Sequence, residues 1–168
     1  MLNINNYIGD GFEKVCDVSV DRSSRSWFYK NIDEGLMYSS HNSWVYFIVS
    51  NSTIVKCGES GNPLGIKEAY YYGNREAQPI ASSKCRFGRL RRGDSTDGYI
   101  RDMLNGSIGP KNTVSLWAKK CAIITTNANI GGVMQQAYAA NHKCLELLYL
   151  NHFKNNTGGL PWLNKVSK

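Results

Sequence analysis

The stretch Trp44–Ser60, WVYFIVSNSTIVKCGES, decides the fold of this 168-residue chain. Val45–Val49 and Ile54–Val55 are runs of β-branched and aromatic residues, and the polar Ser50–Thr53 between them has the composition of a turn. The pattern predicts two antiparallel strands joined as a β-hairpin. Taken alone, the segment favours ordinary packing in a half-buried hairpin.

A tyrosine and a lysine in this hairpin form a candidate chemical pair. Side chains alternate across a strand, so Lys56 shares a face with Gly58, and Tyr46 points to one face of the preceding strand. With a loop of about three residues, Tyr46 and Lys56 would lie nearly opposite each other, roughly 5 Å apart at Cβ. An ammonium beside a phenol stabilises phenolate, which provides a base near neutral pH. The hairpin is therefore also a candidate catalytic element.

Composition and length place the chain among compact globular proteins. Its hydrophobic content of 42% and charged content of 20% are those of one folded domain, which excludes wholesale disorder. The sequence has no apolar run of about 18 residues and no secretory signal at its start, so we expect no membrane span. Five scattered cysteines without CxxC spacing are typical of reduced, buried thiols in a cytoplasmic protein.

The net charge of +7 is clustered rather than spread along the chain. Twelve of the thirteen acidic residues lie at or before Asp102, and only Glu146 follows them, against seven lysines in the same part of the chain. The segment Lys84–Arg92 adds five cations without an acid. Clustered positive charge of this kind favours binding of a polyanion, and nucleic acid is the commonest polyanion in the cytoplasm. We therefore expect nucleic-acid binding, with a solvated basic surface as the alternative.

The remaining patterns predict one α+β domain, with a small central antiparallel β-sheet flanked by helices. Residues 1–40 are expected to form an N-terminal extension packed on the core, with weak strand patterns around Lys14–Val20 and Trp27–Tyr29. Residues 41–168 are expected to form the main domain. After the hairpin, the expected elements are a helix over 63–72, an insertion around 68–84, a helix over 94–104, a strand over 114–124 and a long helix over 132–153. The last helix is expected to bury residues such as Val133.

Two charged residues outside the hairpin add candidate chemistry. Glu146 lies between leucines, and a carboxylate in apolar company is costly unless a metal ion, an arginine or a hydrogen-bond donor meets it. The alternative is a surface ion pair between Glu146 and Lys143 on one helix. Arg89 follows Gly88, and a glycine lets the backbone approach a phosphate closely. Glu146 is thus a candidate metal ligand, and Arg89 is a candidate phosphate contact.

The order of these features resembles that of the GIY-YIG nucleases over roughly residues 44–164. Tyr46 corresponds to the tyrosine of the first motif half. Lys56-Cys57-Gly58 corresponds to the second half, with lysine where most members have tyrosine. One branch of GIY-YIG restriction enzymes is similar there, with Lys-Ile-Gly followed by His-Ser where this chain has Glu59-Ser60.

The later motifs resemble the family in the same order. Gly88-Arg89-Leu90-Arg91 is similar to the Gly-Arg-Ile-Arg of another restriction-enzyme branch, and Glu146 matches the metal-binding glutamate. Lys67 is the rival of Arg89 because of its spacing from the second motif half. Pro161-Trp162-Leu163-Asn164 resembles the terminal Pro-x-Trp-Asn, with the asparagine displaced by one residue and farther from the glutamate than usual.

The resemblance implies a metal-dependent DNA endonuclease that hydrolyses phosphodiester bonds, most similar to small type II restriction enzymes. Its expected partner is double-stranded DNA, bound by a homodimer. The alternatives are a phage-type endonuclease of low specificity and a non-cleaving nucleic-acid-binding protein on the same scaffold.

The resemblance also implies a role for each candidate residue. Glu146 would bind one divalent ion, Mg²⁺ with Mn²⁺ as a substitute. Tyr46 would take the proton from the attacking water, with Lys56 lowering the pKa of Tyr46 or orienting that water. Arg89 would neutralise charge on the phosphoryl oxygens, and Asn164 would be the last catalytic residue. The residues expected to contact DNA are Lys67, Lys84, Arg86, Arg91 and Arg92.

Overall fold

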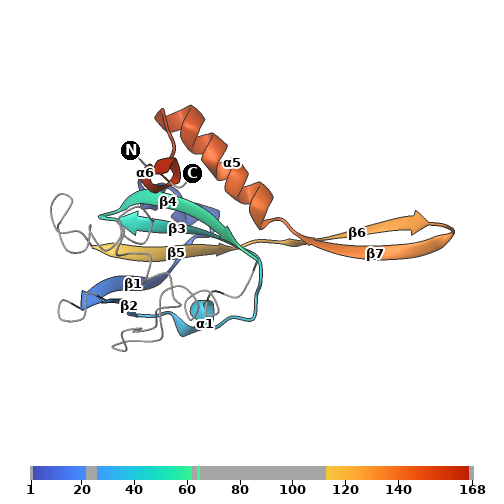
Figure 1. The fold of residues 1–168 in the computed structure, drawn as a ribbon, viewed down its shortest axis with the longest axis horizontal. Helices are drawn as coiled ribbons and strands as arrows, with labels where there is room; N and C mark the ends of the chain where they lie inside the picture. The colour runs from blue at the N-terminus through green and yellow to red at the C-terminus, as the bar shows by residue number, and fades with distance from the viewer. Residues whose placement is uncertain (1, 22–25, 62–63, 65–112, 167–168) are drawn as a thin grey trace.

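A five-stranded antiparallel sheet forms the body of the protein in this computed structural model, which describes residues 2–21, 26–61, 64 and 113–166 (Figure 1). The strands lie in the order β2-β1-β5-β3-β4. Their bounds are Glu13–Asp21 for β1, Ser26–Lys30 for β2, Trp44–Ser50 for β3, Thr53–Ser60 for β4 and Val114–Lys120 for β5. The expected α+β fold with a central antiparallel sheet is confirmed.

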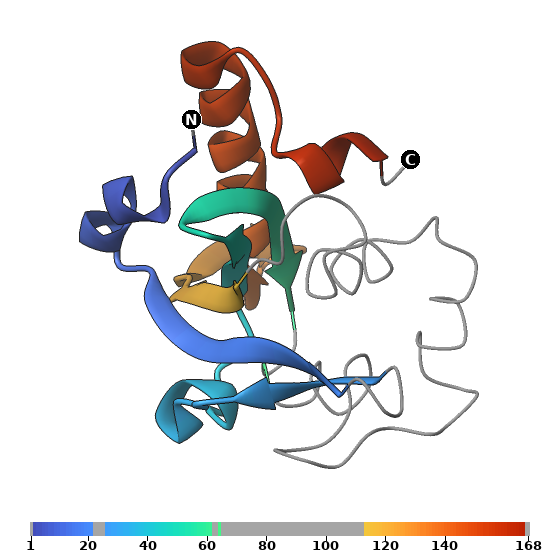
Figure 2. The same ribbon diagram turned by 90° about the vertical axis from the view of Figure 1, so that its left-hand side faces the viewer.

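Helices flank this sheet at two places. α5 and α6 lie beside β4, and α1 lies beside β1 at the other end of the sheet (Figure 1, Figure 2). None of the helices in the described ranges is long and apolar enough to cross a membrane. The bounds of the helical segments are Ile4–Asn6 for η1 and Ile8–Asp10 for η2, both 3₁₀ turns, Glu34–Met37 for α1, His142–Thr157 for α5 and Trp162–Val166 for α6.

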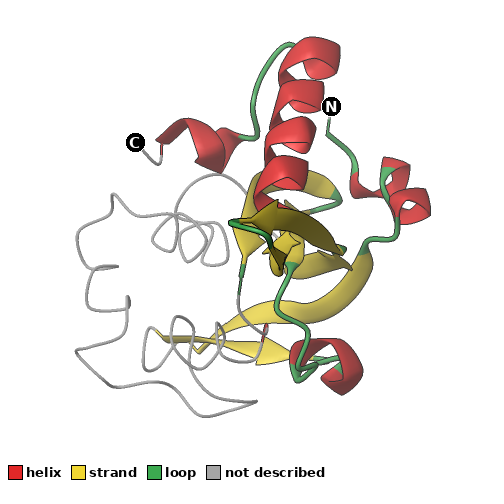
Figure 3. Ribbon diagram, turned by 90° about the vertical axis from the view of Figure 1, so that its right-hand side faces the viewer, coloured by secondary structure: helices red, strands yellow, loops and turns green. Residues whose placement is uncertain are grey.

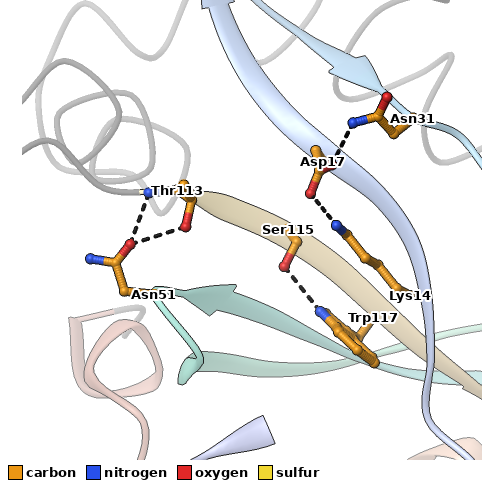
Figure 4. A network of polar contacts seen from close by, with 7 residues as sticks. All are labelled: Lys14, Asp17, Asn31, Asn51, Thr113, Ser115 and Trp117. Atoms are coloured by element: carbon orange, nitrogen blue, oxygen red, sulfur yellow. Dashed lines mark hydrogen bonds and ion pairs between the residues drawn. The ribbon is translucent and has the colours of Figure 1, made fainter.

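The β3–β4 hairpin predicted over Trp44–Ser60 is confirmed, and its turn is attached to the start of β5. Asn51 and Ser52 form a two-residue turn with positive φ angles of 46° and 69°. The side-chain oxygen of Asn51 accepts hydrogen bonds of 3.0 Å from both the backbone N–H and the hydroxyl of Thr113 (Figure 4). These bonds hold the first residues of β5 next to the hairpin.

The register of this hairpin differs from the expected one by two residues. Tyr46 lies opposite Gly58, and Lys56 lies opposite Ile48. The expectation that Tyr46 and Lys56 face each other directly is wrong, because the turn has only two residues and a bulge after Ile48 inserts Val55 into β4. Lys56 is instead a diagonal neighbour of Tyr46, at a distance that a long side chain still covers.

The core lies on both faces of the sheet. On one face, α5 and the N-terminal turns pack against β3, and the rings of Phe12 and Phe47 stack with their centroids 3.9 Å apart. Tyr7 joins this cluster through edge contacts with Phe47 and Phe153. On the other face, Leu163 of α6 packs with α1 and the inner residues of β1 and β3. The helices on the two faces approach each other at β4 (Figure 3).

The N-terminal residues contribute strands to this sheet. The strand patterns around Lys14–Val20 and Trp27–Tyr29 are confirmed as β1 and β2, and β1 pairs directly with β5. Lys14 forms an ion pair of 2.6 Å with Asp17, and the amide of Asn31 donates a hydrogen bond of 2.7 Å to the same carboxylate (Figure 4). Residues before the hairpin therefore complete the sheet as well as covering it.

A second, two-stranded sheet follows β5. β6 spans Ile123–Ile130 and β7 spans Val133–Ala140, and they pair along their whole length. The strand expected over 114–124 therefore ends at Lys120, and the helix expected over 132–153 begins only at His142. The first part of that helix prediction is wrong.

A glycine pair explains the error. Gly131 and Gly132 have φ angles of 61° and 82°, which suit the two-residue turn of a β-hairpin. Pairing between β6 and β7 outweighs the helical spacing of the apolar residues that follow this turn. Val133, expected on a buried helix face, is 59% exposed on a strand.

Part of the prediction lies outside the described residues. This applies to the helices expected over 63–72 and 94–104 and to the insertion around 68–84, apart from helical Leu64.

Among the described cysteines, the expected burial is confirmed for three and is wrong for Cys144, which is exposed. The three buried free thiols are Cys16, Cys57 and Cys121.

The packing of the N-terminal segment on α5 and β3 predicts a large effect of one truncation. Phe12→Ala should lower the free energy of unfolding by about 3–5 kcal/mol, because the ring is fully buried against Phe47. Urea denaturation measures this change. The control is Ile8→Ala, whose side chain is 48% exposed and whose loss should change the free energy of unfolding by less than about 0.5 kcal/mol. Equal, small effects of both variants would show that the segment is not part of the core.

Candidate functional site

The ring of Tyr46 lies directly on the backbone of Gly58. A Cβ atom at Gly58 would lie 2.5 Å from the hydroxyl oxygen of Tyr46, far closer than such atoms approach in proteins. Only glycine therefore leaves room for this ring at this position. Since β4 is the edge strand, the ring of Tyr46 extends from β3 across β4 toward the edge of the sheet.

Two charged side chains act electrostatically on Cys57, the residue of β4 that precedes Gly58. Burial raises the pKa of the Cys57 thiol well above its usual range; the carboxylate of Glu146 raises it further, and the ammonium of Lys56 lowers it. Lys56 comes from β4 itself, and Glu146 comes from the second turn of α5. Both side chains are half-buried. The thiol of Cys57 stays protonated, so Cys57 serves as a core residue rather than as a nucleophile.

Asn164 binds the same stretch of β4 from α6. Its side-chain oxygen accepts a hydrogen bond of 2.8 Å from the backbone N–H of Cys57, and its amide donates one of 2.8 Å to the backbone oxygen of Cys57. These two bonds replace a neighbouring strand at the edge of the sheet. Asn164 therefore positions the strand that carries Lys56 and Gly58, and its predicted catalytic role stays a prediction.

Four predicted site residues thus converge on Cys57 and Gly58. They come from β3, β4, α5 and α6, and they are Tyr46, Lys56, Glu146 and Asn164. The predicted phosphate ligand and the predicted DNA contacts lie outside the described residues. These are Arg89, Lys67, Lys84, Arg86, Arg91 and Arg92.

A chain of three polar residues next to the site, two of them buried, was not foreseen from the sequence. His142 lies between Ser43 and Glu59, with Nδ1 3.2 Å from the Ser43 hydroxyl and Nε2 3.2 Å from the Glu59 carboxylate. Ser43 is fully buried, which makes it inaccessible as a nucleophile. Because His142 begins α5 and Glu146 follows one turn later, the contact fixes Glu146 relative to Gly58.

No local pattern in the sequence reveals this contact, because Ser43 and Glu59 lie far from His142 along the chain.

The donor set suits a magnesium ion better than a zinc ion. Among residues 2–21, 26–61, 64 and 113–166, no three His, Cys, Asp or Glu side chains gather as metal ligands. A tetrahedral zinc site needs three or four such ligands. Mg²⁺ is commonly held by one or two carboxylates, with water and substrate phosphate as the other ligands. The half-buried carboxylate of Glu146 fits that arrangement.

Comparison with known proteins identifies the fold. Neither a protein-family profile nor a curated protein sequence matches this chain. The solved structure of a mutant of bacteriophage T4 EndoII is similar over 96% of this chain and 98% of that one, with a TM-score of 0.59 and 14% identity. The restriction endonuclease HPY188I in complex with product DNA is similar over 95% of this chain and 84% of that one, with a TM-score of 0.49 and 19% identity. The likeness to T4 EndoII extends over the whole α+β fold.

The close approach of Tyr46 and Gly58 predicts a strong energetic coupling. Gly58→Ala should lower the free energy of unfolding by about 1–3 kcal/mol, because the new methyl group displaces the ring. In a Tyr46→Ala background the same change should cost less than about 0.5 kcal/mol, since the clash is gone. Urea denaturation of the four proteins in this double-mutant cycle measures the difference.

A matched control separates the clash from a general effect of replacing glycine. A Cβ atom at Gly9 would meet no atom within 4 Å, so Gly9→Ala should have little effect in either background. If Gly58→Ala costs the same with and without the Tyr46 ring, the two residues do not constrain each other.

Proposed function

We propose that this chain is an endonuclease of the GIY-YIG type that hydrolyses phosphodiester bonds of double-stranded DNA with the help of a divalent metal ion. The observation that carries the proposal is the convergence of Tyr46, Lys56 and Glu146 on the adjacent residues Cys57 and Gly58 at the sheet edge. The basic segment Lys84–Arg92 supports DNA as the substrate. The similarity in fold to T4 EndoII over nearly the whole of both chains adds support.

The arrangement contains the separate parts that this slow reaction requires. Enzymes that hydrolyse phosphodiesters remove well over ~15 kcal/mol of barrier, and a general base alone contributes only about 10²–10⁴-fold. Tyr46 is proposed to accept the proton of the attacking water, and Lys56, diagonal to it, orients that water and stabilises negative charge. Arg89 is proposed to bind the phosphoryl oxygens, which suits a bidentate guanidinium.

Glu146 is the residue proposed to hold the metal ion. A bound Mg²⁺, or Mn²⁺ in its place, supplies Lewis-acid stabilisation of the negative charge that develops on the phosphate and the leaving group. The contact of His142 with Glu59 holds the first turn of α5 on β4, which positions Glu146, one turn further along α5, relative to this strand.

The biological class proposed is a sequence-specific type II restriction enzyme that acts as a homodimer. A two-fold symmetric pair of sites suits a short palindrome, whose two strands carry equivalent bonds. The alternative is a phage-type endonuclease of low specificity, and the similarity in fold to a bacteriophage protein is the observation that favours it. A non-cleaving DNA-binding protein on the same scaffold is the third reading.

Digestion of supercoiled plasmid DNA with Mg²⁺ tests the proposal and distinguishes these readings. Discrete fragments support a restriction enzyme, whereas smears or sparse nicks support the phage-type alternative, and no product favours binding without cleavage. Glu146→Gln should lower the cleavage rate at least about 100-fold, because it removes the charge that holds the ion. DNA binding in a mobility-shift assay without metal should change little.

The control is Glu34→Gln, an equal loss of charge at an exposed carboxylate on α1. This variant should cleave at the wild-type rate. Full activity of Glu146→Gln, or activity that persists in EDTA, would contradict the role given to Glu146.

A second experiment decides whether Arg89 or Lys67 is the catalytic cation. If Arg89 binds the reacting phosphate, Arg89→Ala lowers turnover at saturating DNA, whereas Lys67→Ala mainly weakens affinity. The loss of one backbone contact should also reduce the slope of log affinity against log salt by about 1. The opposite pattern would transfer the catalytic role to Lys67.

A further inference from the structure

The β6–β7 ribbon extends away from the body of the protein as an arm (Figure 1). Each of its strands has eight residues, and they form a sheet separate from the central one. All residues of β6 and all but the last of β7 are exposed. A two-stranded ribbon with nothing packed against it is at best marginally stable in water. The arm therefore requires a partner surface.

The two faces of the arm differ in chemistry. The register pairs Ile124 with Ala139, Thr126 with Ala137, Ala128 with Gln135 and Ile130 with Val133, so these residues share one face, which we call the Ile124 face. Apolar and small side chains dominate this face, with Ile130 64% exposed and Val133 59% exposed. Small alanines at its centre would let a second sheet approach closely.

The opposite face of the arm is more polar. It carries Asn127 opposite Gln136, Asn129 opposite Met134, Thr125 opposite Tyr138 and Ile123 opposite Ala140. The Tyr138 hydroxyl donates a hydrogen bond of 2.5 Å to the side-chain oxygen of Gln136. These two polar groups of the face are therefore paired with each other. Six of the eight residues of the Ile124 face are apolar, against four of eight on the opposite face, which also carries the exposed side chains of Met134 and Tyr138. The Ile124 face is therefore the more apolar of the two.

The absence of charged residues from the arm indicates what kind of partner it binds. No Asp, Glu, Lys, Arg or His occurs between Lys120 and His142, in a chain whose net charge is +7. A DNA-binding arm would need cations to neutralise phosphates, and this one has none. Two copies of a chain with this charge repel each other unless they meet at an uncharged surface. The arm is such a surface.

We infer that two copies of this chain associate through the Ile124 faces of their arms, packed against each other about a two-fold axis. Such a contact is isologous, because the same apolar patch is buried on both copies. This contact would be an interface of the homodimer described under the proposed function. The inference rests on the proposed function only for the expectation that the chain forms a dimer. Because the arm forms a sheet of its own, the association can be measured without DNA or metal.

Two adjacent substitutions on opposite faces of the arm test the inference. Thr126→Lys places an added charge on the Ile124 face, and Asn127→Lys places the same charge on the polar face. Thr126→Lys should raise the dissociation constant of the dimer at least about 100-fold, because like charges would then be juxtaposed across the two-fold axis. Asn127→Lys should change it by less than about 5-fold.

Sedimentation equilibrium of the full chain at micromolar concentration measures the association. Circular dichroism and thermal unfolding should show that both variants keep the central sheet, since the arm is not part of it. A wild-type monomer, or a Thr126→Lys variant that remains as dimeric as the wild type, would overturn the inference. Loss of the dimer with Asn127→Lys alone would overturn the choice of face. Plasmid digestion in parallel reports on cleavage separately, so a failed nuclease assay does not count against the dimer.

Discussion

The contact between the Tyr46 ring and the backbone of Gly58 is the constraint on which the rest of the site depends. It requires a residue without a side chain in the edge strand, and it requires the register that brings these two residues opposite each other. The bulge after Ile48 and the two-residue turn at Asn51 together produce that register. Asn164 then occupies the free backbone groups next to Gly58, so no neighbouring strand can cover the tyrosine.

The site lies where the two faces of the sheet meet at β4. Helix α5 covers the face that contains Phe47, and α6 packs on the face that contains Tyr46. A side chain from each helix can therefore reach the same short stretch of the edge strand. Burial keeps the thiol of Cys57 protonated, so the thiol is not among the groups proposed to react.

The sequence predicted those parts of the fold in which local pattern and long-range pairing agree. The β3–β4 hairpin and the strands near Lys14 and Trp27 have strand composition, and the sheet places them as strands. The apolar spacing after Gly132 fits a helix as well as a strand, and only pairing with β6 decides between them. Candidate site residues followed from their order in the chain, but the contacts of His142 join positions far apart in sequence, which no local pattern reveals.

The hydrogen bonds between Asn51 and Thr113 have a consequence for how this sequence can vary. They mark the position at which the chain, after leaving β4, returns to the central sheet and pairs with β3. The entropy lost in closing a loop grows only with the logarithm of its length, about 0.6 kcal/mol for each doubling. The stretch that connects β4 to β5 can therefore lengthen or shorten at little thermodynamic cost, as long as both ends stay attached. The DNA contacts proposed for this stretch could therefore change during evolution while β3, β4 and β5 keep their pairing.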